Sequence, residues 1–240
     1  MRITLVCQFI IFMIFADSCS SKNLKNSKTT PYGVFKYSDV DSELIDDLIG
    51  CCKTNLPDIE SALNVKIHPE TIIEVFPSQA EYDRKIINEN LKGSPAISGY
   101  GKIQLVSPKA PIRIENIPYK ERLWFLIHEY VHLSIDQIDP SLPIFLNEGL
   151  ACYFGSYNFY KTVVSRYFDK LKSYPSIDQL TDNYDKIMGV DVYSFLFIVF
   201  IVRTEGQQNL VTVLRDHQSL RAKNGDWINF LEELKQNSRL

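Results

Sequence analysis

The sequence has little net charge, few glycines and prolines, and no internal repeat. Its formal net charge is −3 and its pI is near 5.8, which gives no electrostatic reason to expect a nucleic-acid partner. Residues 3–15 and 195–202 are strongly apolar, but both segments are shorter than the roughly 20 residues of a membrane-spanning helix. With 45% hydrophobic and 23% charged residues, the composition is that of an ordinary globular protein, long enough for one large domain or two small ones.

The N-terminal residues have the pattern of an export signal. Arg2 precedes the apolar segment 3–15, which has the length of a signal-peptide core. The small residues before Cys19 and the polar residues after it resemble a bacterial lipoprotein signal, which implies that Cys19 is lipidated and anchors the chain to a membrane of the cell envelope. An ordinary secretory signal, with a secreted or periplasmic product, is the alternative. We therefore predict a signal peptide over 1–19, a flexible polar tether over 20–31 and one domain over 32–240.

The pattern of apolar residues predicts an α+β fold. It indicates a small N-terminal sheet, an active-site helix and a mainly helical C-terminal part. Pro57 is expected to kink or end the first helix, and Ser78 is a plausible helix cap. The expected strands are 32–37, 72–76 and 102–106, and the expected helices are 41–63, 78–90, one from Pro118 through 128–132, one carrying Glu148, 157–173, 191–205, 207–217 and 225–236.

Three cysteines lie beyond the signal: Cys51, Cys52 and Cys152. An odd number in an exported chain leaves at least one thiol without a partner in the same chain. We expect all three to be buried apolar residues. A disulfide between Cys152 and one of the two neighbouring cysteines is the alternative.

The segment HEYVH, from His128 to His132, has the spacing of a metal site. Residues at i and i+4 share one face of a helix, so both histidines can bind the same ion. Glu129 lies beside them, and Glu148 on the following helix can supply a third ligand. Three protein ligands and one open position are typical of catalytic zinc, whereas a structural zinc site has four ligands.

The chemistry of such a site is hydrolysis. Zinc lowers the pKa of a bound water to about 7, and Glu129 can accept the proton as general base. Short HExxH matches also arise by chance on solvated or salt-bridged helix faces. Here two of only four histidines fall in the motif, on a helix that is apolar almost all round and should be buried.

HEYVH followed by FLNEGLACYF resembles the gluzincin metallopeptidases, and the predicted element order resembles the peptidase MA-like domain family. The resemblance implies a zincin-like α+β fold with a Zn²⁺ cofactor. It assigns His128, His132 and Glu148 as metal ligands and Glu129 as the catalytic base. The apolar helix that begins near Asp191 resembles the segment in which a tyrosine hydrogen-bonds the tetrahedral intermediate, which makes Tyr193 the candidate oxyanion donor; packing at a helix start is the alternative.

Two other segments bear on the function. Aminopeptidases of this clan grip the substrate amine with an acid on a strand, and residues 98–106 contain none. We therefore expect cleavage within peptide or protein substrates, with Lys102 to Val106 pairing as an edge strand with the extended peptide. His217 lies in a polar stretch and is expected at the surface.

The sequence thus predicts a membrane-tethered zinc endopeptidase of the envelope. The alternatives are a zincin-like lipoprotein that binds peptides or envelope partners with little or no turnover, and a zinc hydrolase of a non-peptide amide. The sequence leaves the oligomeric state open.

Overall fold

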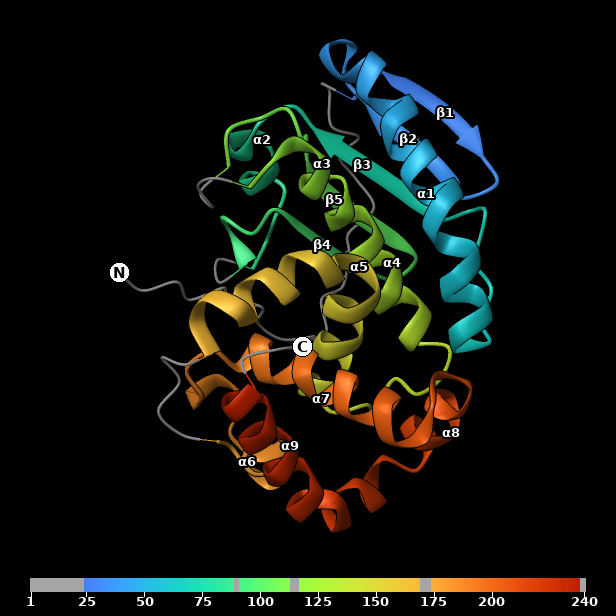
Figure 1. The fold of residues 1–240 in the computed structure, drawn as a ribbon. Helices are drawn as coiled ribbons and strands as arrows, with labels where there is room; N and C mark the ends of the chain where they lie inside the picture. Colours follow the sequence, from blue (N-terminus) through green and yellow to red (C-terminus); the bar gives the residue numbers. More distant parts are fainter. Residues whose placement is uncertain (1–23, 89–90, 113–116, 169–173, 238–240) are drawn as a thin grey trace. The chain divides into compact units, whose positions relative to one another are not determined.

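The computed structural model describes residues 24–88, 91–112, 117–168 and 174–237 (Figure 1). The predicted signal peptide, including Cys19, lies outside these residues. None of the described helices is long and apolar enough to cross a membrane. The chain is mixed α and β, as predicted, and it divides into two compact units. Among the described residues, the first comprises those within 24–57 and 66–133, and the second those within 58–65 and 134–237.

The first unit contains a five-stranded sheet of order β1-β2-β3-β5-β4. Its strands are β1 (Asn26–Thr30), β2 (Gly33–Tyr37), β3 (Ile72–Phe76), β4 (Ala96–Gly99) and β5 (Lys102–Val106). The pairs β2–β3 and β3–β5 are parallel, and β1–β2 and β4–β5 are antiparallel. The predicted bounds of β3 and β5 are confirmed.

The sheet corrects two predictions. Residues 26–30, expected to belong to a flexible tether, form β1, which pairs along its whole length with β2. Lys102–Val106, expected as an edge, is paired with β3 on one side and with β4 on the other. In the part of the chain that the structure describes, β4 is the edge strand on that side.

Both faces of the sheet carry buried apolar side chains, because successive residues of a strand point to opposite faces and apolar residues occur at both kinds of position. Ile73 and Val75 of β3 and Ile103 and Leu105 of β5 are fully buried on one face. On the other face, Phe76 and Val106 pack with Tyr82, Ile86 and Ala110. Tyr82 belongs to α2 (Gln79–Asp83), and the predicted cap is confirmed, since the Ser78 hydroxyl accepts a hydrogen bond from the Glu81 backbone N–H. The helix is shorter than expected.

Helix α1 (Ser42–Leu63) continues through Pro57, which was expected to interrupt it. A proline inside a helix removes one backbone hydrogen bond, but Leu56, Ile59 and Leu63 on either side are at most 2% exposed. Their burial stabilises the helical course against that loss.

The cysteines are free thiols: Cys52 and Cys152 are buried and Cys51 is half-buried.

The second unit is helical. Its α-helices are α5 (Ile144–Tyr167), α6 (Ile177–Asp182), α7 (Val190–Glu205), α8 (Leu210–Arg215) and α9 (Asn224–Asn237). Helix α5 joins the segment that carries Glu148 to the start of the helix predicted over 157–173, with a break in helical geometry at Ser156. The predicted 191–205 and 225–236 helices are α7 and α9.

Helices α5 and α7 pack at unusually close range. A Cβ on Gly149 would lie 2.4 Å from the Ser194 carbonyl oxygen and 2.9 Å from the Ile198 side chain. Aromatic pairs extend the contact, with Phe145 and Phe197 ring centroids 5.3 Å apart and Tyr160 and Phe195 centroids 5.6 Å apart. Gly149 is thus required by packing rather than by backbone conformation.

Gly149→Ala is expected to destabilise the protein by about 1–3 kcal/mol, because the new methyl group forces α5 and α7 apart. Urea denaturation measures this free energy of unfolding. The matched control is Gly50→Ala in α1, where a Cβ meets nothing within 4 Å and a gain of about 0.5–1 kcal/mol is expected. Equal effects at the two positions would contradict the close-packing account.

Candidate metal site

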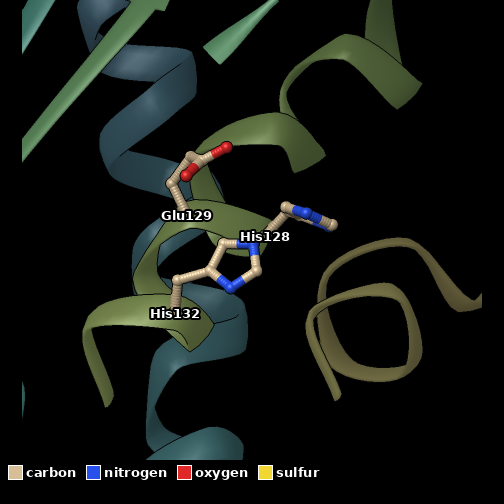
Figure 2. A group of neighbouring side chains, drawn as sticks. All are labelled: His128, Glu129 and His132. Atoms are coloured by element: carbon tan, nitrogen blue, oxygen red, sulfur yellow. The ribbon is translucent and has the colours of Figure 1, made fainter. Parts of the chain in front are cut away.

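Three potential metal ligands gather on α4 (Trp124–Ile135). The ligand atoms of His128, Glu129 and His132 all lie within 4.8 Å of one another. The two imidazole rings stand nearly perpendicular, with centroids 4.8 Å apart. Figure 2 shows the three side chains on this helix. The helical spacing has therefore brought together the residues that the sequence predicted from the HEYVH motif.

One side of α4 is fully buried, as its apolar sequence predicted. Leu126, Ile127 and Val131 are 0% exposed, whereas Trp124 and Phe125 remain half-buried. The burial removes the apolar side chains from water and fixes the orientation of the helix. The histidines are held on a helix that cannot rotate without exposing this surface.

A polar contact ties α4 to the sheet. The Tyr130 hydroxyl donates a hydrogen bond to the Tyr32 carbonyl oxygen, in the β1–β2 turn, at 2.5 Å. Ahead of α4, the Cys51 thiol of α1 donates to the Leu123 carbonyl oxygen at 3.9 Å, and the Tyr119 hydroxyl donates to the Asp47 carboxylate at 2.6 Å. These contacts connect segments far apart in sequence, so they position the site in three dimensions.

Glu129 is the most buried member of the trio, at 7% exposed, while both histidines are half-buried. Burial raises the pKa of Tyr82, and the negative charge of Glu129 adds to that rise. The Tyr82 hydroxyl hydrogen-bonds with the Ser94 hydroxyl at 3.0 Å. Tyr82 is therefore a neighbour of the site that motif reading missed, because only the sheet and α2 bring it close.

The donor set fits a transition metal. Imidazole nitrogen is a preferred ligand of zinc, and a carboxylate beside two imidazoles can act as ligand or as base. Burying a carboxyl group away from water costs free energy unless hydrogen bonds or an opposite charge compensate it. A cation held by His128 and His132 would supply that charge next to Glu129.

The other two predicted site residues belong to the second unit. Glu148 is half-buried on α5, and Tyr193 is 2% exposed near the start of α7. Burial raises the pKa of Tyr193, and the neighbouring Tyr174 adds to the rise, so its hydroxyl stays protonated and able to donate. The roles of Glu148 as third ligand and of Tyr193 as oxyanion donor stay predictions.

Within the second unit, the carboxylates of Glu148 and Asp191 both act on Cys152. Burial raises the pKa of the Cys152 thiol, and the charges of Asp191 and Glu148 raise it further, which places both carboxylates near that sulfur. Asp191 in turn accepts a hydrogen bond from the Tyr184 hydroxyl at 2.8 Å. Motif spacing does not predict this grouping, because Asp191 comes from a helix remote in the chain.

An exposed turn joins β4 and β5. Tyr100 and Gly101 both have positive φ, of 51° and 71°, and Gly99 pairs with Lys102. This is the geometry of a two-residue hairpin turn whose two central residues are left-handed. The Gly-Tyr-Gly sequence was the available signal for the hairpin and for strand β4.

No known protein family matches the sequence, and no curated protein matches it either.

Proposed function

We propose that this protein is a zinc-dependent hydrolase of peptide bonds. The observation that carries the proposal is the convergence of His128, Glu129 and His132, with ligand atoms within 4.8 Å of one another on a largely buried helix. Two imidazoles and a buried carboxylate at this spacing are the elements of an HExxH zinc site. In this proposal Glu148 completes the ligand set.

Zinc, when bound, acidifies a water molecule and polarises the carbonyl group that the water attacks. Glu129 accepts the proton from the attacking water and returns it to the leaving amine nitrogen. Its place beside the two histidines, and its burial, keep the proton transfer away from bulk solvent. Tyr193, whose hydroxyl stays protonated, donates a hydrogen bond to the developing oxyanion.

We further propose that the fold is zincin-like and that the substrate binds as an extended peptide. Support comes from the mixed sheet, whose antiparallel strand β4 lies at an edge among the described strands. An edge strand offers backbone N–H and carbonyl groups that an added peptide strand can pair with. We therefore assign the pairing with a substrate peptide to β4 instead of β5, because β5 is paired on both sides.

The site of action in the proposal is the cell envelope. This location is inferred from the predicted export signal and from the predicted lipidation at Cys19, by which the chain would be tethered to a membrane. The protein would then act on peptides or proteins outside the cytoplasm.

The first expectation is that the purified protein binds zinc and that His128→Ala, His132→Ala or Glu148→Ala releases it. Each removes a ligand, so the loss of affinity should exceed the roughly 10–100-fold cost of losing an outer-shell partner. Zinc content after dialysis, by mass spectrometry, measures this. His68→Ala is the control, since that side chain is 58% exposed; retention of zinc in all the ligand variants would refute the site.

Glu129→Gln is expected to keep zinc and to lower kcat by roughly 10²–10⁴-fold, because the amide cannot accept the proton. Digestion of a peptide library, followed by mass spectrometry, measures turnover, with zinc measured on the same samples. Glu70→Gln is the matched control, at a side chain 77% exposed. Full turnover in the Glu129 variant would show that another group is the base, and no turnover in the wild type would favour a binding protein.

For Tyr193→Phe, we expect kcat to fall roughly 10²–10³-fold, with KM and zinc content unchanged, because one oxyanion donor is lost. Steady-state kinetics on a peptide cleaved by the wild type test this. Tyr157→Phe, on α5 of the same unit, is the control. An unchanged kcat in the Tyr193 variant would assign that residue to packing alone.

A further inference from the structure

Residues 136–143 form the α4–α5 linker, which joins the helix of His128 and His132 to the helix of Glu148. In the proposed function, the metal ligands therefore come from both sides of this linker. Holding such a segment in one conformation costs backbone entropy, so contacts must compensate that cost. The contacts of the linker thus bear on the proposed ligand set.

Asp139 is the centre of the linker. Its backbone N–H donates to the Ile135 carbonyl oxygen at the end of α4 at 3.0 Å, and its carbonyl oxygen accepts from the Leu142 N–H at 3.2 Å. Its carboxylate accepts from the Ser141 backbone N–H at 2.8 Å and from the Ser141 hydroxyl at 2.6 Å. Leu142 precedes Pro143, the N-cap residue of α5. Asp139 therefore connects the end of one helix to the start of the next.

His217 contacts Asp139 from a segment remote in the chain, and it is not the surface residue expected from the sequence. Its side chain is only 18% exposed, and Nδ1 lies 3.5 Å from an Asp139 carboxylate oxygen and 3.2 Å from the Leu214 carbonyl oxygen. Hydrogen bonds from Ser141 lower the pKa of Asp139, so its carboxylate is ionised near neutral pH. Because both neighbours of Nδ1 are acceptors, this nitrogen carries a hydrogen whether the ring is neutral or charged.

The segment that carries His217 is itself anchored. His217 is the first residue of η6 (His217–Lys223), a 3₁₀ segment. Leu214 before it and Leu220 within it are each 1% exposed. Because moving η6 would expose these side chains to water, it provides a fixed point for the contact with Asp139.

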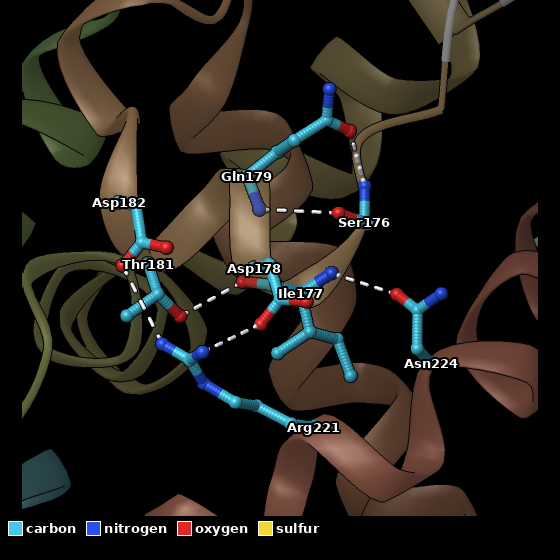
Figure 3. A network of polar contacts seen from close by, with 8 residues as sticks. All are labelled: Ser176, Ile177, Asp178, Gln179, Thr181, Asp182, Arg221 and Asn224. Atoms are coloured by element: carbon cyan, nitrogen blue, oxygen red, sulfur yellow. Dashed lines mark hydrogen bonds and ion pairs between the residues drawn. The ribbon is translucent and has the colours of Figure 1, made fainter.

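Polar contacts hold the other end of η6 (Figure 3). Arg221 Nη1 lies 3.0 Å from an Asp178 oxygen of α6, and Nη2 lies 3.5 Å from an Asp182 oxygen. Directly after η6, the Asn224 side-chain oxygen accepts a hydrogen bond from the Ile177 backbone N–H at 2.9 Å. Exposed ion pairs contribute little free energy singly, so here they add to the anchoring that the buried leucines provide.

We propose that His217 and Asp139 are positioning residues, which hold the α4–α5 linker in one conformation and so present Glu148 to the metal. This inference rests on the proposed function, in which Glu148 is the third ligand. A linker with one conformation leaves α5 fewer positions relative to α4, so less entropy is lost when ligands from both helices bind one ion.

The first test is hydrogen exchange of the metal-free protein, read by mass spectrometry on a peptide that covers the linker. In His217→Ala, exchange should be about fivefold faster, because the linker opens more often once a polar contact is lost. His217→Asn, whose amide N–H can take the place of Nδ1–H, should return exchange to within about twofold of the wild type.

Gln218→Ala is the matched control for exchange. Gln218 is exposed and lines the same cavity, of about 450 Å³, as His217. Its truncation should leave exchange of the linker unchanged, so equal acceleration in the Gln218 and His217 variants would overturn the proposal.

A double-mutant cycle tests whether His217 acts through Asp139. In an Asp139→Ala background, whose linker should already exchange faster, His217→Ala should add less than about twofold. A role of the His217 ring in packing alone would give the same increment in both backgrounds. If Asp139→Ala does not fold, rescue by His217→Asn decides between the polar contact and packing.

The second readout is zinc affinity, measured by competition with a chelating dye. It should be about threefold weaker in His217→Ala, by the loss of one modest polar contact, and as in the wild type in His217→Asn and Gln218→Ala. Unchanged exchange in His217→Ala, or faster exchange with unchanged zinc affinity, overturns the positioning role alone. A wild type that binds no zinc overturns the metal site itself, so the two failures are distinguishable.

Discussion

The burial of Glu129 is the constraint on which the candidate site depends. Glu129 is 7% exposed and lies next to two half-buried imidazoles, and burying a polar group away from water costs free energy unless a partner compensates it. A structural role would not need this arrangement, because an apolar side chain on the same face would pack at lower cost. In the proposed site, a metal bound by His128 and His132 would lie beside this carboxylate and would give it a chemical use.

The first unit fixes the position of the helix that carries Glu129. Strands β3 and β5 have buried apolar residues on both faces of the sheet, and α4 buries Leu126, Ile127 and Val131. The hydrogen bond from Tyr130 to the Tyr32 carbonyl links α4 to the β1–β2 turn. Residues 26–30 matter to the site for this reason: by pairing with β2 they make that turn part of the sheet instead of part of a tether.

In the second unit, the motif that contains Glu148 has a packing role. Gly149 follows Glu148 and permits the close approach of α5 to Ser194 of α7, so part of the Asn-Glu-Gly pattern is explained by helix contact alone. The same helix α5 contributes Phe145 and Leu146 to a cavity that also contains His217 and Arg221.

The sequence by itself determined the α+β class, the bounds of β3 and β5, and the trio of His128, Glu129 and His132, because these depend on periodicities of two and about 3.6 residues within one segment. Only the tertiary structure decided that residues 26–30 form a strand, that β4 and not β5 is an edge, and that α1 passes through Pro57. It also brought Tyr82 near Glu129, and Asp191 near Cys152. Those outcomes depend on strand pairing and burial between segments far apart in the chain, which local propensity does not encode.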